Sequence, residues 1–144
     1  MSVFRRLYLQ IAVALLLMAQ TTSTEVGSCI VSERSALFHL KVGLSDPGNL
    51  LFSWEGHDCC HWKGVGCSNK TSHVVKLDLH GTPGFLDTGL GGNISSSLLS
   101  LQRLPYLNLS PNWFSSLRVP YFLSSLHDLR YLSLSDSDFA GRIP

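Results

Sequence analysis

The sequence predicts an α/β solenoid, in which short coils stack side by side around a shared core, and three observations predict it. Leucines recur at one spacing in two segments that lie 25 residues apart, around positions 104 and 129. All four cysteines precede these segments. A largely apolar run after two arginines begins the chain. We therefore expect a secretion signal (1–24), a cap that contains the cysteines (25–73) and about two and a half repeated coils (74–144).

Length and composition are those of one ordinary globular unit. The chain has 144 residues, of which 44% are hydrophobic and 15% charged, so nothing in its composition predicts disorder. The formal net charge of +1 gives no reason to expect a nucleic-acid or acidic-lipid partner.

The first 24 residues have the three parts of a secretory signal peptide. Arg5 and Arg6 form the basic start, residues 7–19 form the largely apolar run, and small residues follow at 21–24. The run is shorter than the ~20 residues that span a bilayer. An uncleaved signal anchor is the alternative, and either form delivers the rest of the chain to an oxidising compartment. No second apolar run follows, so we expect no transmembrane segment within these residues.

The cysteines indicate disulfides, because an even number in a small secreted segment is typical of a disulfide framework. They are Cys29, Cys59, Cys60 and Cys67. A bridge between the adjacent Cys59 and Cys60 would strain the peptide between them. Two pairings remain open: Cys29–Cys59 with Cys60–Cys67, or Cys29–Cys60 with Cys59–Cys67.

Zinc is the other chemistry that this cluster could support. Three cysteines and one histidine make a four-ligand site, and the candidates are Cys59, Cys60 and Cys67 with His57, His61 or His73. The secreted context and the absence of a C-x-x-C pair argue against such a site. We therefore expect neither a metal nor another cofactor.

A helix is predicted between the first two cysteines. Ser32 can cap its start, and Glu33 suits its first turn. The sequence Asp-Pro-Gly at 46–48 should end it. Three leucines recur at helical spacing on one face: Leu37, Leu40 and Leu44.

Two tryptophans, Trp54 and Trp62, follow the helix. The cap is too small to build a core from aliphatic residues alone, so we expect both rings to fill the space between the helix and the first coil. An exposed pair that binds sugar is the alternative.

The first strand is predicted directly after the cap. Val75, Leu77 and Leu79 alternate with polar residues, as in a strand with one buried face. A turn-rich segment at 82–89 lengthens this first coil, because Leu77 and Leu107 lie 30 residues apart.

Two repeats follow, with leucines in the pattern L-x-x-L-x-L-x-x-N. The first has Leu104, Leu107, Leu109 and Asn112, and the second has Leu129, Leu132, Leu134 and Ser137. This pattern with a period of about 20–29 residues is typical of a leucine-rich repeat, in which stacked coils bury their leucines and a short parallel sheet lines the concave side. Asn112 can satisfy backbone groups at the turn after the strand, and Ser137 can satisfy fewer.

Binding in this architecture would use the polar positions between the strand leucines, on the concave face. The candidate contacts are Tyr106, Asn108 and Ser110 in one strand, and Tyr131, Ser133, Ser135 and Asp136 in the next. Tyrosines in neighbouring strands could form a contact ladder for a peptide or protein. The alternative, which the small number of strands favours, is that they are ordinary solvent-facing residues.

The cap and the repeats together resemble plant extracellular leucine-rich repeat proteins. In the cap the match is carried by Cys29, by residues 33–37 (ERSAL), by Ser53-Trp54 and by residues 58–67 (DCCHWKGVGC). It continues through residues 75–81 (VKLDLHG) into both repeats. This class includes receptor-like proteins, receptor-like kinases and polygalacturonase-inhibiting proteins. The resemblance implies the disulfide pairing Cys29–Cys59 with Cys60–Cys67.

Within this class the sequence is most similar to receptor-like proteins of the disease-resistance type. Residues 92–99 (GNISSSLL), 128–132 (DLRYL) and 141–144 (GRIP) carry this finer match. It implies a recognition module in defence or developmental signalling that binds a protein or peptide ligand and a co-receptor. The alternatives are a secreted inhibitor of the polygalacturonase-inhibiting kind and the ectodomain of a receptor kinase, which sequence beyond residue 144 would separate.

Three N-x-S/T sequons begin at Asn69, Asn93 and Asn108. In a secreted chain each is a candidate for N-glycosylation. Asn69 lies in a polar loop and is the best candidate, and Asn93 is expected on the convex side. Asn108 is the least favoured, because a glycan there would cover the concave face.

No catalytic arrangement is recognisable in the sequence. The six histidines are scattered, and no nucleophile motif, HExxH sequence or phosphate-binding glycine loop occurs. We expect no enzymatic activity.

The second repeat reaches Pro144 without a capping repeat. Solenoids usually need at least about three repeats and a polar end to be soluble. We therefore expect the N-terminal part of a longer ectodomain or a truncated gene product. It would be secreted, or held at the cell membrane by sequence beyond residue 144.

Overall fold

The structure, a computed structural model, describes most of the chain after residue 27. The described residues are 28–82, 88–114, 118–142 and 144, together with Arg5, Arg6, Tyr8 and Gln10. The predicted signal peptide lies almost wholly outside them, as does most of the turn predicted at 82–89. No helix within the described ranges is long and apolar enough to cross a membrane.

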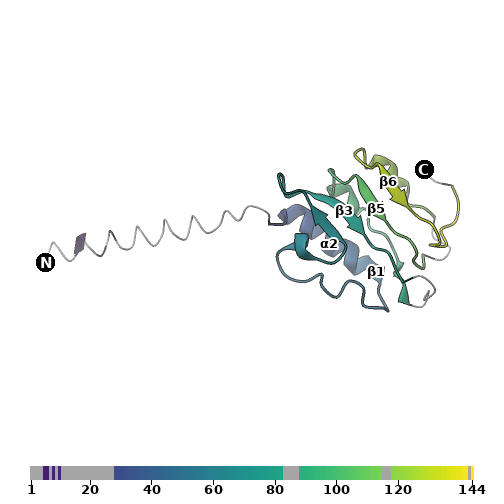
Figure 1. Cartoon of the computed structure of the whole chain (residues 1–144), viewed down its shortest axis with the longest axis horizontal. Helices are drawn as coiled ribbons and strands as arrows, with labels where there is room; N and C mark the ends of the chain where they lie inside the picture. The colour runs from purple at the N-terminus through teal and green to yellow at the C-terminus, as the bar shows by residue number, and fades with distance from the viewer. Residues whose placement is uncertain are drawn as a thin grey trace.

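Short strands alternate with helical segments along the described part of the chain (Figure 1). The helical elements are α2 (Val31–Gly43) and the 3₁₀ helices η1 (Cys59–His61), η3 (Ser96–Ser100) and η4 (Tyr121–Ser125). The strands are β1 (Leu44–Ser45), β2 (Val65–Cys67), β3 (Val74–Asp78), β4 (Gly91–Gly92), β5 (Tyr106–Asn108) and β6 (Tyr131–Ser133).

The main sheet has the strand order β2-β3-β5-β6. Strand β2 is antiparallel to β3, whereas β3, β5 and β6 run parallel to one another. Helix α2 contacts η3, and η3 contacts η4, so these segments form a second layer, and α2 lies behind the sheet in Figure 1. A short parallel sheet with helical segments packed behind it confirms the predicted α/β solenoid.

The start of α2 differs from the prediction. Ile30 occupies the N-cap position without a side-chain hydrogen bond, and Ser32 is exposed inside the first turn, so the prediction that Ser32 caps the helix is wrong. Glu33 is instead buried, and its carboxylate accepts a hydrogen bond from the Val74 N–H at 2.8 Å. Its other oxygen lies 2.8 Å from His73 Nδ1. A contact with β3 therefore anchors the helix start.

The helix also ends earlier than predicted. It stops at Gly43, before the Asp-Pro-Gly segment, and Leu44 leaves the helical face to enter β1, which pairs with β4. Gly92 in β4 has φ +81°, and a Cβ added there would lie 2.7 Å from the Gly43 oxygen. The close approach of two backbones, which glycine permits, thus draws the chain out of the helix.

The tryptophans fill the cap core, as predicted. Trp54 and Trp62 are 0% and 3% exposed, and their rings stack with centroids 5.4 Å apart. Each indole N–H donates to a backbone oxygen, Trp54 to Lys63 at 2.9 Å and Trp62 to Glu55 at 2.7 Å. Buried aromatic area and satisfied polar tips together hold the loop after α2 in one conformation.

The first strand keeps the predicted alternation only in part. Leu77 and Leu79 are buried as expected, but Val74 is fully buried whereas Val75 is half-buried. The pairing of β2 with β3 shifts register between Gly66 and Cys67. Such a bulge changes which side chains face the core.

Burial of the repeat leucines decreases along the solenoid. The inward leucines of the first repeat, Leu98, Leu101, Leu104, Leu107 and Leu109, are at most 1% exposed. Those of the last strand and its flanks, Leu129, Leu132 and Leu134, are half-buried. Within the described ranges no strand pairs with the outer edge of β6, so its leucines have neighbours on one side only.

Candidate functional site

Just after β5, the side chain of Asn112 forms hydrogen bonds to two neighbouring coils, and these bonds fix the coils next to the concave face. Its side chain is 1% exposed, and its Nδ2 donates to the Leu79 oxygen at 2.6 Å and to the Leu109 oxygen at 2.9 Å. Its Oδ1 accepts from the Leu90 N–H at 2.9 Å. The predicted role of this asparagine in satisfying backbone groups at the turn is confirmed.

Ser137 occupies the same place one coil later. Its hydroxyl donates to the Leu109 oxygen at 2.7 Å and lies 3.1 Å from the Ser135 oxygen. A hydroxyl has one proton, whereas the amide of Asn112 has two and also accepts. Ser137 therefore satisfies fewer backbone groups, as predicted.

Two tyrosines from neighbouring strands stack on the concave face, the solvent-facing side of β3, β5 and β6. Tyr106 lies opposite Tyr131 in the register of β5 and β6. Their ring centroids are 4.5 Å apart and their planes differ by 6°. Tyr131 is 47% exposed, so the stacked pair presents an aromatic surface to solvent.

Lys76 extends this row onto β3. It lies opposite Tyr106 in the register, and its ammonium nitrogen lies 5.2 Å from the centroid of the Tyr106 ring, within reach of a cation–π interaction. Burial raises the pKa of the Tyr106 hydroxyl above its ordinary value of 10.0, and the Asp78 charge adds to the shift. The phenol is protonated at neutral pH, as it would be at its ordinary pKa, and can donate a hydrogen bond. We call Lys76, Tyr106 and Tyr131 the tyrosine ladder.

A row of small polar groups runs beside the tyrosine ladder. Asp78, Asn108 and Ser133 lie opposite one another in the register. Ser110 is 7% exposed, donates to Asn108 Oδ1 at 2.8 Å, and lies 2.5 Å from Ser133 Oγ. Ser135 continues the row, with its hydroxyl 3.4 Å from that of Ser133. Asn108 and the three serines lie within hydrogen-bond distance of one another, and Asp78 contacts His80, so the ladder offers the freer contact surface.

The remaining predicted contact, Asp136, lies beyond the end of β6. It is exposed and has φ +49°, in a turn. The structure therefore brings Tyr106, Asn108, Tyr131 and Ser133 together on the sheet and places Asp136 outside it.

The four cysteines form two disulfides in the cap. Cys29 pairs with Cys59 and Cys60 with Cys67, with Cα–Cα distances of 5.2 Å and 5.4 Å. This is the pairing that the family resemblance implies. Since all four sulfurs are paired, no thiolate is left for zinc. The bridges tie the segment before α2 to η1, and η1 to β2.

The three sequons lie in different surroundings. Asn69 is exposed in the turn before β3, and Asn93 is exposed directly after β4. Asn108 is half-buried in β5, where its Oδ1 accepts hydrogen bonds from both the backbone N–H and the hydroxyl of Ser110.

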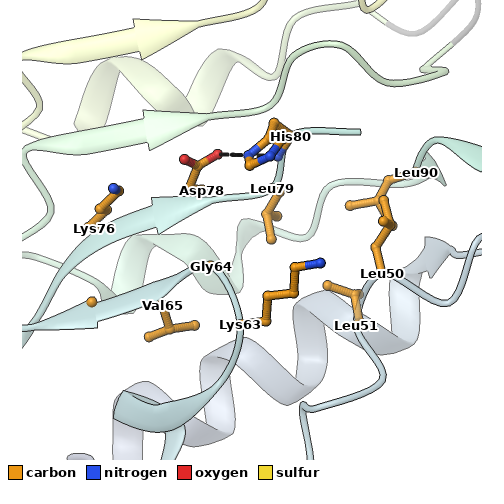
Figure 2. A pocket seen from close by; sticks show the side chains of 11 residues that line it. Leu50, Leu51, Lys63, Gly64, Val65, Lys76, Asp78, Leu79, His80 and Leu90 are labelled. Atoms are coloured by element: carbon orange, nitrogen blue, oxygen red, sulfur yellow. Dashed lines mark hydrogen bonds and ion pairs between the residues drawn. The ribbon is translucent and has the colours of Figure 1, made fainter. Parts of the chain in front are cut away.

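A pocket of about 310 Å³ lies at the cap end of the concave face, which sequence reasoning missed (Figure 2). Its apolar lining comes from Leu50, Leu51, Val65, Leu79 and Leu90, and its polar lining from Lys63, Lys76, Asp78 and His80. Gly64 and Gly66 complete it. Four separate segments, at 50–51, 63–66, 76–80 and 90, build this pocket, so no single motif marks it. The alternation Lys63-Gly64-Val65-Gly66 is the one local signal.

Comparison with known proteins identifies the family that this chain resembles. Residues 31–68 match the family described as the leucine rich repeat N-terminal domain. The chain is 45% identical over 131 residues to Receptor-like protein EIX2 from Solanum lycopersicum, an alignment that covers 85% of this chain and 13% of that relative. The chain therefore spans only a small part of the length of this relative.

Solved structures show the same likeness. The ectodomain of BIR2 from Arabidopsis thaliana matches 81% of this chain and 60% of its own, with 33% identity and a TM-score of 0.66. The Arabidopsis receptor kinase HAESA, solved in complex with the peptide hormone IDA and the co-receptor SERK1, matches 80% of this chain and 19% of its own, with 32% identity and a TM-score of 0.66. Disulfide-bonded cap, repeated leucines and these likenesses agree, and the chain belongs to the plant extracellular leucine-rich repeat proteins of the receptor-like type, of which it has the N-terminal cap and the first repeats.

Proposed function

We propose that this chain is part of an extracellular recognition module of a receptor-like protein in defence or developmental signalling, and that it binds a peptide or protein on its concave face. The tyrosine ladder carries the proposal, because large rigid aromatic groups with a polar tip are enriched where proteins bind partners. The likeness to a receptor kinase solved with a peptide hormone and a co-receptor supports the same class of partners. The proposal is one of binding and involves no catalysis.

The ectodomain of a receptor kinase is the second candidate, which the likeness to HAESA favours. Both candidates would use the same surface and differ in the sequence beyond residue 144. Reading the native transcript past this codon separates them, because a receptor kinase would continue beyond its membrane helix into a cytoplasmic kinase domain, whereas a receptor-like protein would have only a short tail there.

Peptide binding to the tyrosine ladder can be tested by selecting phage-displayed peptides that bind the chain secreted from plant cells. We expect the Tyr106→Ala/Tyr131→Ala double variant to bind the selected peptides about tenfold or more weakly, because buried aromatic anchors carry much of the binding energy. Tyr121→Ala is the matched control, since Tyr121 is 82% exposed but lies in η4, outside the main sheet. Equal binding by both variants would overturn the proposal.

A further inference from the structure

The pocket at the cap end of the concave face has a lining that fits one kind of ligand group. We propose that it binds the C-terminal residue of a peptide, which places an apolar side chain next to a free carboxylate. This inference rests on the proposed function, because the rest of the peptide would lie along the tyrosine ladder.

The floor of the pocket suits an apolar side chain. Leu51, Leu79 and Leu90 are at most 4% exposed, whereas Leu50 and Val65 are half-buried and leave apolar surface open to the pocket. A side chain that covers this surface removes apolar area from water, which is favourable. The volume of about 310 Å³ is at the small end of the range for ligand pockets, about 300–1,000 Å³, so it suits one residue better than a longer segment.

The charges around the pocket favour a carboxylate. Lys63 and Lys76 both line it, and in the part of the chain that the structure describes neither ammonium lies within 4.0 Å of a carboxylate. The one acidic group in the lining, Asp78, has its Oδ1 2.7 Å from Nδ1 of His80. The Lys76 ammonium lies over the Tyr106 ring, whereas Lys63 has no ion-pair partner among the described residues. Lys63 therefore places a cation beside the apolar surface, where it complements a carboxylate that is attached to an apolar side chain.

The loop on one side of the pocket is held in place before any ligand binds. Both oxygens of Asp46 accept hydrogen bonds from the loop after α2, from the Leu50 N–H at 2.7 Å and the Leu51 N–H at 2.8 Å. Figure 2 shows these leucines on one side of the opening, with the Lys63 side chain extending toward them. A fixed loop lowers the entropy cost of binding.

The lysine and the far wall are held as well. The Lys63 backbone is anchored on both sides, since its N–H donates to Ser53 Oγ at 2.8 Å and its oxygen accepts from the Trp54 indole. Asn112 binds the Leu79 oxygen and the Leu90 N–H, so one side chain fixes both leucines of the wall. The pocket is therefore a preformed site, of the kind that binds without rearrangement.

Lys76 makes the pocket continuous with the tyrosine ladder. It lines the pocket and lies opposite Tyr106 in the register of β3 and β5. A Cβ added at Gly66 would lie 3.1 Å from Lys76 Cβ, so glycine gives the lysine stem its room. A peptide that runs along the ladder therefore reaches the pocket at its end.

Selection from two peptide libraries against the secreted chain tests whether the pocket binds a peptide C-terminus. One library presents free C-termini, and in the other the C-terminus is fused to the display protein. We expect the free-C-terminus library to yield peptides that end in an apolar residue. A synthetic selected peptide should bind about tenfold or more tightly as its acid than as its amide, because a charge-assisted hydrogen bond to lysine is lost in the amide.

Lysine variants link that preference to the pocket. Lys63→Gln should reduce the acid-to-amide ratio to near one, whereas Lys70→Gln should leave it unchanged. Lys70 is exposed in the turn at 69–71, outside the pocket lining, and is the matched control. Both positions are exposed, so an unchanged denaturation midpoint can verify that each variant is folded.

Each outcome decides the proposal. Equal binding of acid and amide overturns the pocket assignment, while loss of binding in the Tyr106→Ala/Tyr131→Ala variant would leave the proposed function standing. A failure of both libraries to yield peptides overturns both. If N-acetyl-leucine binds as tightly as the selected peptide acid, the pocket takes free small acids, and the assignment to a peptide C-terminus is wrong.

Discussion

Single buried polar side chains hold neighbouring coils together. Asn112 satisfies three backbone groups in two coils, and Glu33 links α2 to β3 through one buried carboxylate. A buried donor or acceptor that loses its partner costs about 1–3 kcal/mol, more than a typical hydrogen bond contributes. These residues therefore matter more to stability than their size indicates.

Asn112→Ala tests this at the first turn. We expect it to lower the free energy of unfolding by about 3 kcal/mol or more, because the Leu90 N–H and the Leu79 oxygen lose a buried partner. Ser137→Ala should cost about 1 kcal/mol, because the Leu109 oxygen still accepts from Asn112. Urea denaturation of the secreted chain, followed by tryptophan fluorescence, measures both. Equal losses would show that the turns are held by other contacts.

The cap is the element that depends most on cross-links. Its helix and loop bury two tryptophans and the Cys29–Cys59 bridge, and the Cys60–Cys67 bridge is half-buried beside them. Cys59 is 0% exposed, so the first bridge lies within the core. The bridges differ in the length of chain they close, with sequence separations of 30 for Cys29–Cys59 and 7 for Cys60–Cys67.

Loop length predicts which bridge stabilises the chain more. A bridge restricts the unfolded chain, and the closure entropy it removes should stabilise the fold by about 3.5 kcal/mol for the longer loop and about 2.5 kcal/mol for the shorter. We therefore expect the Cys29→Ala/Cys59→Ala variant to be about 1 kcal/mol less stable than the Cys60→Ala/Cys67→Ala variant. Thermal and urea unfolding of the two double variants provide the comparison. A larger loss from the short-loop variant would contradict the entropic account.

Helices and strands were predictable where the spacing of apolar residues determines them, and less predictable where they form by contact between segments distant in the sequence. The leucine spacing predicted the coils, and the face of Leu37 and Leu40 predicted the helix. The C-terminal end of α2 was mispredicted because β1 pairs with β4, and its start because Glu33 binds the backbone of β3. Strand β2 was not predicted, because three residues with a central glycine carry no alternation of their own and form a strand only against β3.

At the scale of the whole molecule, the concave face was predictable from the sequence and the pocket was not. The row that includes Tyr106 and Tyr131 followed from their equal places in two repeats, and the structure stacks them. The pocket did not follow, because its lining comes from the loop after α2, from the segment at 63–66 and from the end of β3 with Leu90. Contacts between segments of unrelated sequence leave no pattern to read.

The distribution of sequons over the molecule predicts which faces carry glycans. We expect mass spectrometry of the secreted protein to find Asn69 and Asn93 glycosylated, because both are exposed, and Asn108 unmodified, because its side chain is half-buried and bonded to Ser110. Ser110→Ala, which removes the third sequon, should leave the glycan mass unchanged, whereas Thr71→Ala should lower it. A glycan at Asn108 would contradict the proposed use of the concave face.

The bond that crosses from each coil to the one before has a consequence for how such a gene can change. Asn112 binds the oxygen of Leu79, and Ser137 binds the oxygen of Leu109, which holds the same place one coil later. Two successive coils thus offer the same acceptor to the coil that follows. Duplication or deletion of a whole coil by recombination leaves donors and acceptors matched, whereas an insertion inside a coil displaces one from the other. The array can therefore lengthen or shorten in whole units while its fold is inherited unchanged.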